Sequence, residues 1–198
     1  MRKILSLIAI ALTSVMVAAP ASASLIGTTV KGSLQFGTNL TNYFDPANGG
    51  VPASGYTNSS SNSNSATVVI AGGSQIEFGY ADAANTDSAD FNGGSLKIVD
   101  VSTSGGSTAK YIFTDAAFAG LTLVETSDTF LNGGATATLV GTTLTVITPD
   151  FTRAGTYTAS YSLTAAAAVP EPSSIAILGL GLLGFAASRR KSVKNKNA

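Results

Sequence analysis

The feature that most constrains the fold is a two-residue alternation of apolar and polar side chains, which recurs through the middle of this 198-residue chain. It is clearest where Tyr157, Ala159, Tyr161 and Leu163 alternate with threonine and serine, and it is already present from Val30 onward. Successive side chains of a β-strand point to opposite faces, so this pattern predicts strands with one face in a core and the other in water. No stretch of this central region has a helical period over ten residues.

Glycine and asparagine separate most of these segments. Gly72-Gly73, Asn92-Gly93-Gly94 and Asn132-Gly133-Gly134 supply residues that tolerate a positive φ, as tight turns require. About nine strands are predicted, at residues 30–36, 66–71, 75–80, 95–103, 109–114, 121–125, 135–140, 142–147 and 156–163. Many short strands at this spacing predict an all-β fold, an antiparallel β-sandwich that is jelly-roll-like or immunoglobulin-like. A single rolled barrel is the alternative.

The first 23 residues have the parts of a secretory signal peptide. Met1-Arg2-Lys3 is basic, residues 4–19 are apolar, and Ala21-Ser22-Ala23 provides small residues for cleavage. We predict cleavage after Ala23, and cleavage after Ala21 also fits the small-residue rule. An uncleaved membrane helix is the alternative. The secreted β-sandwich domain is therefore expected at residues 24–168.

The last thirty residues, 169–198, predict a second targeting segment. Pro170-Glu171-Pro172 precedes an apolar run at 175–187, and the basic cluster Arg189-Arg190-Lys191 follows it. Two prolines favour a helix that begins near Pro172. A helix over 172–188 would be roughly 25 Å long, short of the ~30 Å hydrocarbon core. This predicts a short transmembrane helix whose basic end stays in the cytoplasm.

These three features, in this order at the end of the chain, closely resemble the PEP-CTERM sorting signal of exported bacterial proteins. The resemblance implies that Pro170, Glu171 and Pro172 are the sorting motif, read by an exosortase-type membrane protease that removes the tail. Arg189, Arg190 and Lys191 would be the cluster that stops membrane transfer. Signal peptidase would be the other processing partner. The protein would be tethered to the inner membrane, with its body in the periplasm, before it reaches the cell surface or extracellular matrix. An ordinary membrane anchor is the alternative.

The body also resembles, more loosely, the threonine- and glycine-rich β bodies that often carry such tails. The resemblance rests on residues 42–46, on Glu77-Phe78 before an Asp/Asn-rich loop, and on residues 113–118. Those bodies mostly have no assigned activity, so this second resemblance supports the sandwich and adds nothing about chemistry.

Charge and composition exclude several functions for the body. It has four cations against ten acids, a net charge of −6, so nucleic-acid binding is not expected. The chain has no histidine and no cysteine. This excludes Ser-His-Asp and Cys-His nucleophiles, histidine-based zinc sites and thiolate metal sites. No cofactor is expected.

One enzyme design that survives is a pair of carboxylates that cleaves a glycosidic bond. The candidate residues are Glu77, Glu125, Asp100, Asp115 and Asp150. Glu77 falls on the polar phase of its predicted strand, which favours a solvated side chain. A Ser-Lys dyad using Lys97 or Lys110 has no local motif. We therefore expect a protein that is not an enzyme, with a glycosidase as the less favoured alternative.

The acidic segment 82–94 offers oxygen ligands suited to calcium. Its candidate ligands are Asp82, Asn85, Asp87 and Asp90. The spacing does not match an EF-hand, because the alternate carboxylates and the closing glutamate are missing. Since these residue types also form turns, the sequence favours a solvated loop and no metal.

A carbohydrate-binding module would need exposed aromatic residues on one sheet face. The candidates are Tyr111, Tyr157 and Tyr161, although the alternation favours core positions for the last two. Residues 57–65 are a serine- and asparagine-rich tract that predicts a mobile loop. Tyr43 and Phe44, before that tract, are expected to fix the start of the loop to the sandwich, and a ligand platform is the alternative.

The signal peptide and the composition predict an exported, non-enzymatic protein, and the resemblance of its tail implies the cell surface or extracellular matrix of a Gram-negative, exopolysaccharide-making, biofilm-forming bacterium. The alternative is an exopolysaccharide-binding module, with exopolysaccharide as the partner.

Overall fold

The computed structural model describes residues 23–50, 52, 56, 65–165, 178–179 and 181–182. The predicted signal peptide, apart from Ala23, and the polar tract 57–65, apart from Ser65, lie outside these residues. So does the predicted sorting segment 169–198, apart from residues 178, 179, 181 and 182, which are helical. Within the described part of the chain, no helix combines the length and apolarity needed to cross a membrane.

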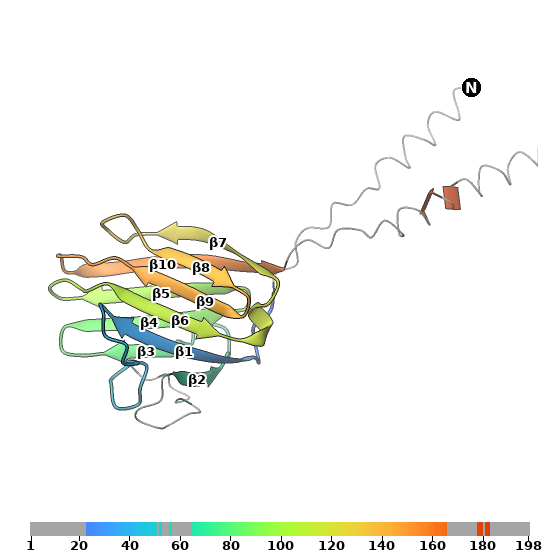
Figure 1. The fold of residues 1–198 in the computed structure, drawn as a ribbon. Helices are drawn as coiled ribbons and strands as arrows, with labels where there is room; N and C mark the ends of the chain where they lie inside the picture. The colour runs from blue at the N-terminus through green and yellow to red at the C-terminus, as the bar shows by residue number, and fades with distance from the viewer. Residues whose placement is uncertain are drawn as a thin grey trace, which may run out of the picture. The chain divides into compact units, whose positions relative to one another are not determined.

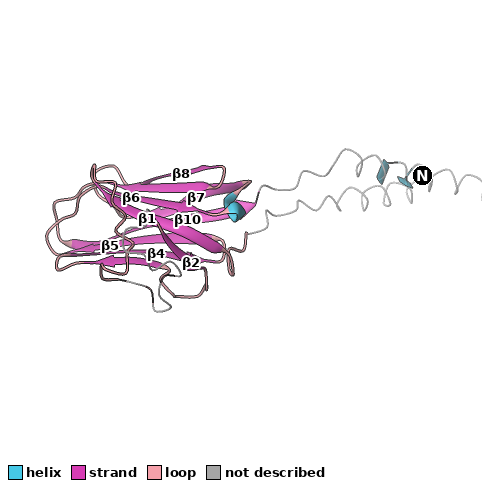
Figure 2. Ribbon diagram, turned by 60° about the horizontal axis from the view of Figure 1, so that its bottom comes forward, coloured by secondary structure: helices cyan, strands magenta, loops and turns pink. Residues whose placement is uncertain are grey.

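Two antiparallel five-stranded sheets pack face to face in one compact unit, Pro20–Ala166, which confirms the predicted all-β sandwich. The first sheet has the order β2-β1-β6-β9-β8, and its strands are β2 (Ala66–Val69), β1 (Thr29–Phe36), β6 (Ala109–Thr114), β9 (Thr143–Thr148) and β8 (Thr136–Val140). The second has the order β3-β4-β5-β10-β7, and its strands are β3 (Phe78–Ala81), β4 (Asn85–Asn92), β5 (Ser95–Ser102), β10 (Gly155–Ala165) and β7 (Leu121–Asp128). The two layers are visible in Figure 1 and nearly edge-on in Figure 2. A short 3₁₀ helix, η1 (Ala116–Phe118), follows β6.

Nine of the ten strands in the described residues correspond to predicted ones, and β4 is the strand that the sequence did not predict. The prediction of a solvated loop over 82–94 is wrong, because β4 pairs with both β3 and β5. Its core-facing residues are Asp87, Ala89 and Phe91, all buried. The sequence does not show this strand because Asp87 occupies an inward position where an apolar residue would be expected. Ser88 and Asp90, like Asp87, are residue types that usually form turns.

Aromatic rings from both sheets fill the space between them. The ring of Phe78 on β3 lies 5.3 Å from Phe113 on β6 and 5.2 Å from Phe44, centroid to centroid. Phe113 also meets Phe91 edge to face at 5.0 Å. Gly32 on β1 makes room for Phe78, because a Cβ at position 32 would overlap its ring. The prediction that Phe44 fixes the following loop to the sandwich is confirmed by its burial in this cluster.

Gly49, Gly50 and Tyr56 lie against the outer edge of β3. The Tyr56 hydroxyl donates to the Gly79 carbonyl at 3.0 Å and accepts from the Gly79 N–H at 3.1 Å. Gly49 forms a bridge with Ala81, whose N–H donates to the Gly49 carbonyl at 2.9 Å. A Cβ at Gly79 would overlap the Gly50 carbonyl, so only glycine permits this close approach.

Glu77 is not the solvated side chain that its strand phase predicts. It is 2% exposed, and its carboxylate accepts from the Phe91 N–H at 2.7 Å and from the Ala71 N–H at 3.3 Å. Phe91 lies on β4 and Ala71 follows β2, so this side chain joins the two sheets. Burial raises the pKa of Glu77, and the hydrogen bond from Phe91 opposes that rise.

We predict that Glu77→Ala destabilises the domain by about 1–3 kcal/mol, because it leaves two backbone N–H groups without their acceptor. Chemical denaturation monitored by circular dichroism measures the change. Glu125→Ala is the control, since Glu125 is exposed on β7 and its removal should change stability by less than about 0.5 kcal/mol. Equal effects of the two substitutions would contradict the role assigned to Glu77.

Candidate functional site

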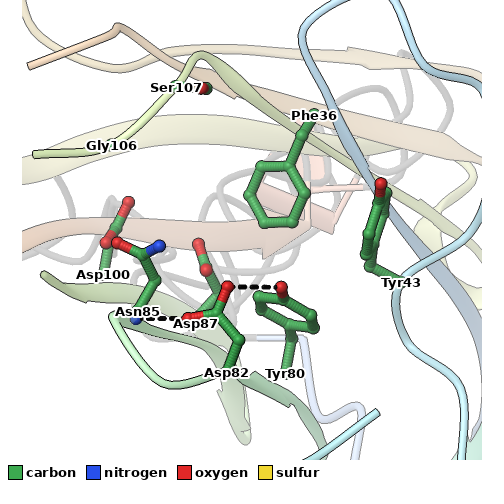
Figure 3. Close-up of a pocket in the computed structure, with 9 residues that line it drawn as sticks. All are labelled: Phe36, Tyr43, Tyr80, Asp82, Asn85, Asp87, Asp100, Gly106 and Ser107. Carbon is green, nitrogen blue, oxygen red and sulfur yellow. Dashed lines mark hydrogen bonds between the residues drawn. The ribbon is translucent and has the colours of Figure 1, made fainter. Parts of the chain in front are cut away.

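A pocket of about 200 Å³ opens at one end of the sandwich, where β1 and β3 end and β4 and β6 begin. Figure 3 shows the nine residues that line it. They are Phe36, Tyr43, Tyr80, Asp82, Asn85, Asp87, Asp100, Gly106 and Ser107. Acidic and aromatic side chains therefore meet in one place although they come from segments up to 71 positions apart, from Phe36 to Ser107.

Three aromatic rings form one wall of the pocket. Phe36 ends β1, Tyr43 lies in the loop after it, and Tyr80 belongs to β3. The ring centroids of Phe36 and Tyr43 are 4.8 Å apart, and Tyr80 lies 5.3 Å from Phe36 and 5.5 Å from Tyr43. Each ring is thus in contact with the other two, in the tilted and edge-to-face arrangements that aromatic pairs prefer.

Two aspartates lie deeper in the pocket. Asp87 on β4 and Asp100 on β5 are direct partners in the antiparallel register, and they are 1% and 3% exposed. Burial, together with the charge of Asp100, raises the pKa of Asp87 to about 7. Burial raises the pKa of Asp100 to about 6. Like charges placed directly opposite each other on neighbouring strands destabilise a sheet, so this pair is unfavourable unless something neutralises it.

A tyrosine from the opposite sheet supports this pair. The hydroxyl of Tyr111 on β6 donates to Oδ1 of Asp87 at 2.6 Å, a charge-assisted hydrogen bond that crosses the core. Tyr111 is fully buried, and burial together with the charge of Asp87 raises the pKa of its hydroxyl. Tyr111 therefore keeps its proton and fixes the orientation of the Asp87 carboxylate.

Asp82 organises the turn between β3 and β4. Its Oδ1 accepts from the backbone N–H groups of Ala84 at 2.7 Å and Asn85 at 2.6 Å, and its Oδ2 accepts from the Tyr80 hydroxyl at 2.8 Å. Burial would raise the pKa of Asp82, but these hydrogen bonds outweigh it and lower the pKa. Figure 3 shows the bonds to Tyr80 and Asn85.

The structure divides the predicted calcium set. Asp82, Asn85 and Asp87 all line the pocket, whereas Asp90 lies on the other face of β4, opposite Lys97 in the register with β5. Among the described residues, no three or more histidine, cysteine, aspartate or glutamate side chains form a group able to hold a metal ion.

The candidate catalytic carboxylates do not converge either. Glu77 holds backbone N–H groups, Glu125 is exposed on β7, and Asp115 accepts from the Ala117 N–H at 2.8 Å to cap η1. Asp150 is exposed after β9. Of the five candidate carboxylates, only Asp100 lines the pocket. Its neighbour there is Asp87, which is not one of the predicted catalytic residues. Lys97 and Lys110 are exposed on their strands.

The aromatic residues proposed for carbohydrate binding are in the core. Tyr111, Tyr157 and Tyr161 are 0%, 7% and 1% exposed, so they offer no face to a sugar. The aromatic wall of the pocket was missed because Phe36 and Tyr80 fall on the apolar phase of their strands. One signal was available, since Asp82, Asn85 and Asp87 follow Tyr80 closely in the sequence.

Comparison with known proteins identifies the tail and not the body. Residues 168–191 match the family described as the PEP-CTERM protein-sorting motif, as the resemblance predicts. The chain therefore carries the signal of proteins that an exosortase sorts for export to the cell surface. Searches of the curated proteins and of the solved structures gave no match.

We predict that Tyr111→Phe destabilises the domain by about 1–3 kcal/mol, because it leaves Oδ1 of Asp87 buried without a donor. Denaturant unfolding provides the measurement. Tyr43→Phe removes a hydroxyl that accepts from Asn39 at the surface and should have a much smaller effect. The interpretation fails if the two variants lose the same stability.

We also predict that stability falls as pH rises from about 4 to about 7. An unfolded aspartate has a pKa near 3.9, so in this window the folded state, with raised pKa values at Asp87 and Asp100, binds more protons than the unfolded state. The free energy that these two raised pKa values contribute to folding is fully present below pH 4. It is lost as pH rises through the folded-state pKa values of about 6 and about 7. Thermal unfolding between pH 4 and 8 should give a flatter profile for Asp100→Asn than for wild type.

Asp150→Asn is the matched control for this profile, because Asp150 is exposed and is not one of the residues that line the pocket. It should follow the wild-type curve. A wild-type curve that coincides with that of Asp100→Asn would show that the pair does not titrate as described.

Proposed function

We propose that this protein is a non-enzymatic component of the bacterial cell surface or extracellular matrix, delivered there by removal of its C-terminal tail. The match of residues 168–191 to the sorting motif carries this proposal. The processing site is assigned to Pro170-Glu171-Pro172, with Arg189-Arg190-Lys191 holding the tail at the cytoplasmic face until an exosortase acts.

The composition of the chain supports a non-enzymatic body. The sequence has no histidine and no cysteine, so thiol nucleophiles and the most frequently used general base are absent. The carboxylates suggested for glycoside hydrolysis are dispersed over the domain, and two of them, Glu77 and Asp115, accept hydrogen bonds from backbone N–H groups. A rigid sandwich with polar loops suits a matrix component better than a catalyst. The second candidate function is exopolysaccharide binding, because exopolysaccharide is the partner that this location suggests. The sorting proposal does not depend on it.

The sorting proposal is tested on the protein recovered from the surface and medium of its host. We predict that the wild-type protein ends near Pro172, whereas a variant with Pro170, Glu171 and Pro172 all replaced by alanine keeps Arg189-Arg190-Lys191 in the membrane fraction. Intact-mass measurement and C-terminal peptide analysis check both outcomes. Substitution of Ser173 and Ser174 by alanine, next to the motif, is the control and should leave the amount of processed protein unchanged.

A wild-type protein that reaches the surface with its tail intact would contradict processing. Equal processing of the wild type and the triple-alanine variant would contradict the assignment of the motif.

A further inference from the structure

Three buried oxygen atoms of the pocket have no hydrogen-bond partner among the described residues. They are Oδ1 of Asn85, Oδ2 of Asp87 and Oδ1 of Asp100. All three residues line the same pocket, which Figure 3 shows, and the two aspartates are more than nine-tenths buried. A buried acceptor without a donor costs about 1–3 kcal/mol, more if it is charged, so three in one pocket require an explanation.

Among the residues that the structure describes, no cationic side chain lines the pocket with these oxygens. The pocket is lined by acidic, aromatic and uncharged residues, and none of its nine lining residues is lysine or arginine. Oδ1 of Asp87 is already occupied by the Tyr111 hydroxyl, which leaves Oδ2 as its free oxygen. The register of β4 and β5 places Asp87 directly opposite Asp100. The backbone thus holds the two carboxylates together despite their repulsion.

We propose that this pocket binds a calcium ion through Oδ1 of Asn85, Oδ2 of Asp87 and Oδ1 of Asp100. Carboxylate and amide oxygens are the ligands that calcium uses, and a doubly charged ion neutralises the pair. Calcium takes six to eight oxygen ligands in a flexible geometry, and the pocket volume of about 200 Å³ leaves room for water to supply the others. With three protein ligands, the affinity falls in the range of extracellular calcium modules, roughly 10⁻⁴–10⁻³ M.

This ligand set differs from the one that the sequence predicts. Both oxygens of Asp82 already accept hydrogen bonds, so Asp82 positions the turn that carries Asn85 and does not coordinate the ion. Asp90 lies on the opposite face of β4. Asp100, which is 13 positions beyond Asp87, takes its place through strand pairing.

The aromatic wall supplies a direct signal for the test. Tyr43 and Tyr80 line the same pocket, so terbium, which replaces calcium at oxygen sites, should give tyrosine-sensitised luminescence with the full-length protein. We expect added calcium to displace terbium and remove this luminescence. Calcium at about ten times its Kd should also raise the Tm by roughly 3–6 °C relative to chelator-treated protein.

Asp87→Asn and Asp100→Asn should each reduce calcium affinity at least about tenfold, while Asp90→Asn, which removes the same charge from the other face of β4, keeps it. In chelator, Asp100→Asn should be at least as stable as wild type because the repulsion is gone. That result would separate a ligand from a residue needed only for folding.

The proposal is overturned if wild-type protein shows no saturable calcium binding up to about 10 mM, beyond the range of extracellular modules. It is also overturned if Asp90→Asn loses binding as Asp100→Asn does. An equal affinity for magnesium would refute the assignment to calcium, because magnesium requires a nearly ideal octahedral shell. If an aspartate variant fails to fold, the terbium and calcium titrations of wild-type protein decide alone.

Discussion

The two sheets pack against each other where the ring of Phe78 lies over Gly32, a position at which any side chain would overlap that ring. Phe78 projects from the edge strand β3 and needs the space that a side chain on β1 would otherwise fill. Its ring then meets Phe44, Phe91 and Phe113, which come from a loop and from both sheets. With no cysteine in the chain, the domain has no disulfide, and the burial of these rings together with the aliphatic side chains of the same core holds the layers together.

The alternation of apolar and polar residues predicted the sandwich because each residue of a strand adds to the same two-residue period. The pattern at Tyr157, Ala159 and Tyr161 places these residues correctly in the core. It failed where a polar residue occupies an inward position. Buried Asp87 accepts a hydrogen bond from Tyr111, 24 positions away, and buried Glu77 accepts from Phe91, 14 positions away, and from Ala71, which is nearer in the sequence but belongs to the other sheet's end. The local sequence pattern does not show such hydrogen-bond partners. Strand β4 and the burial of Glu77 therefore could not be predicted from the sequence.

The same reasoning explains how much of the pocket could be predicted. Asp82, Asn85 and Asp87 are near one another in the sequence, and their grouping was recognised. Asp100 joins them only through the register of β4 with β5, and Phe36 and Tyr43 through the packing of the other sheet's end. The tail is the opposite case. Its motif, apolar run and basic cluster are contiguous, so sequence alone identified it, and the family match to residues 168–191 confirmed it.

The Tyr56 hydroxyl has a consequence for how copies of this protein behave when crowded. Strand β3 ends its sheet, and the outward N–H and carbonyl of Gly79 would be ready to pair with a strand from another molecule. Tyr56 occupies both groups, and Gly49 occupies the neighbouring Ala81. The chain thus caps its own sheet edge with a side chain and a single bridge. A protein gathered at high density on a surface can thereby remain a set of separate domains, since this edge offers no template for a fibre.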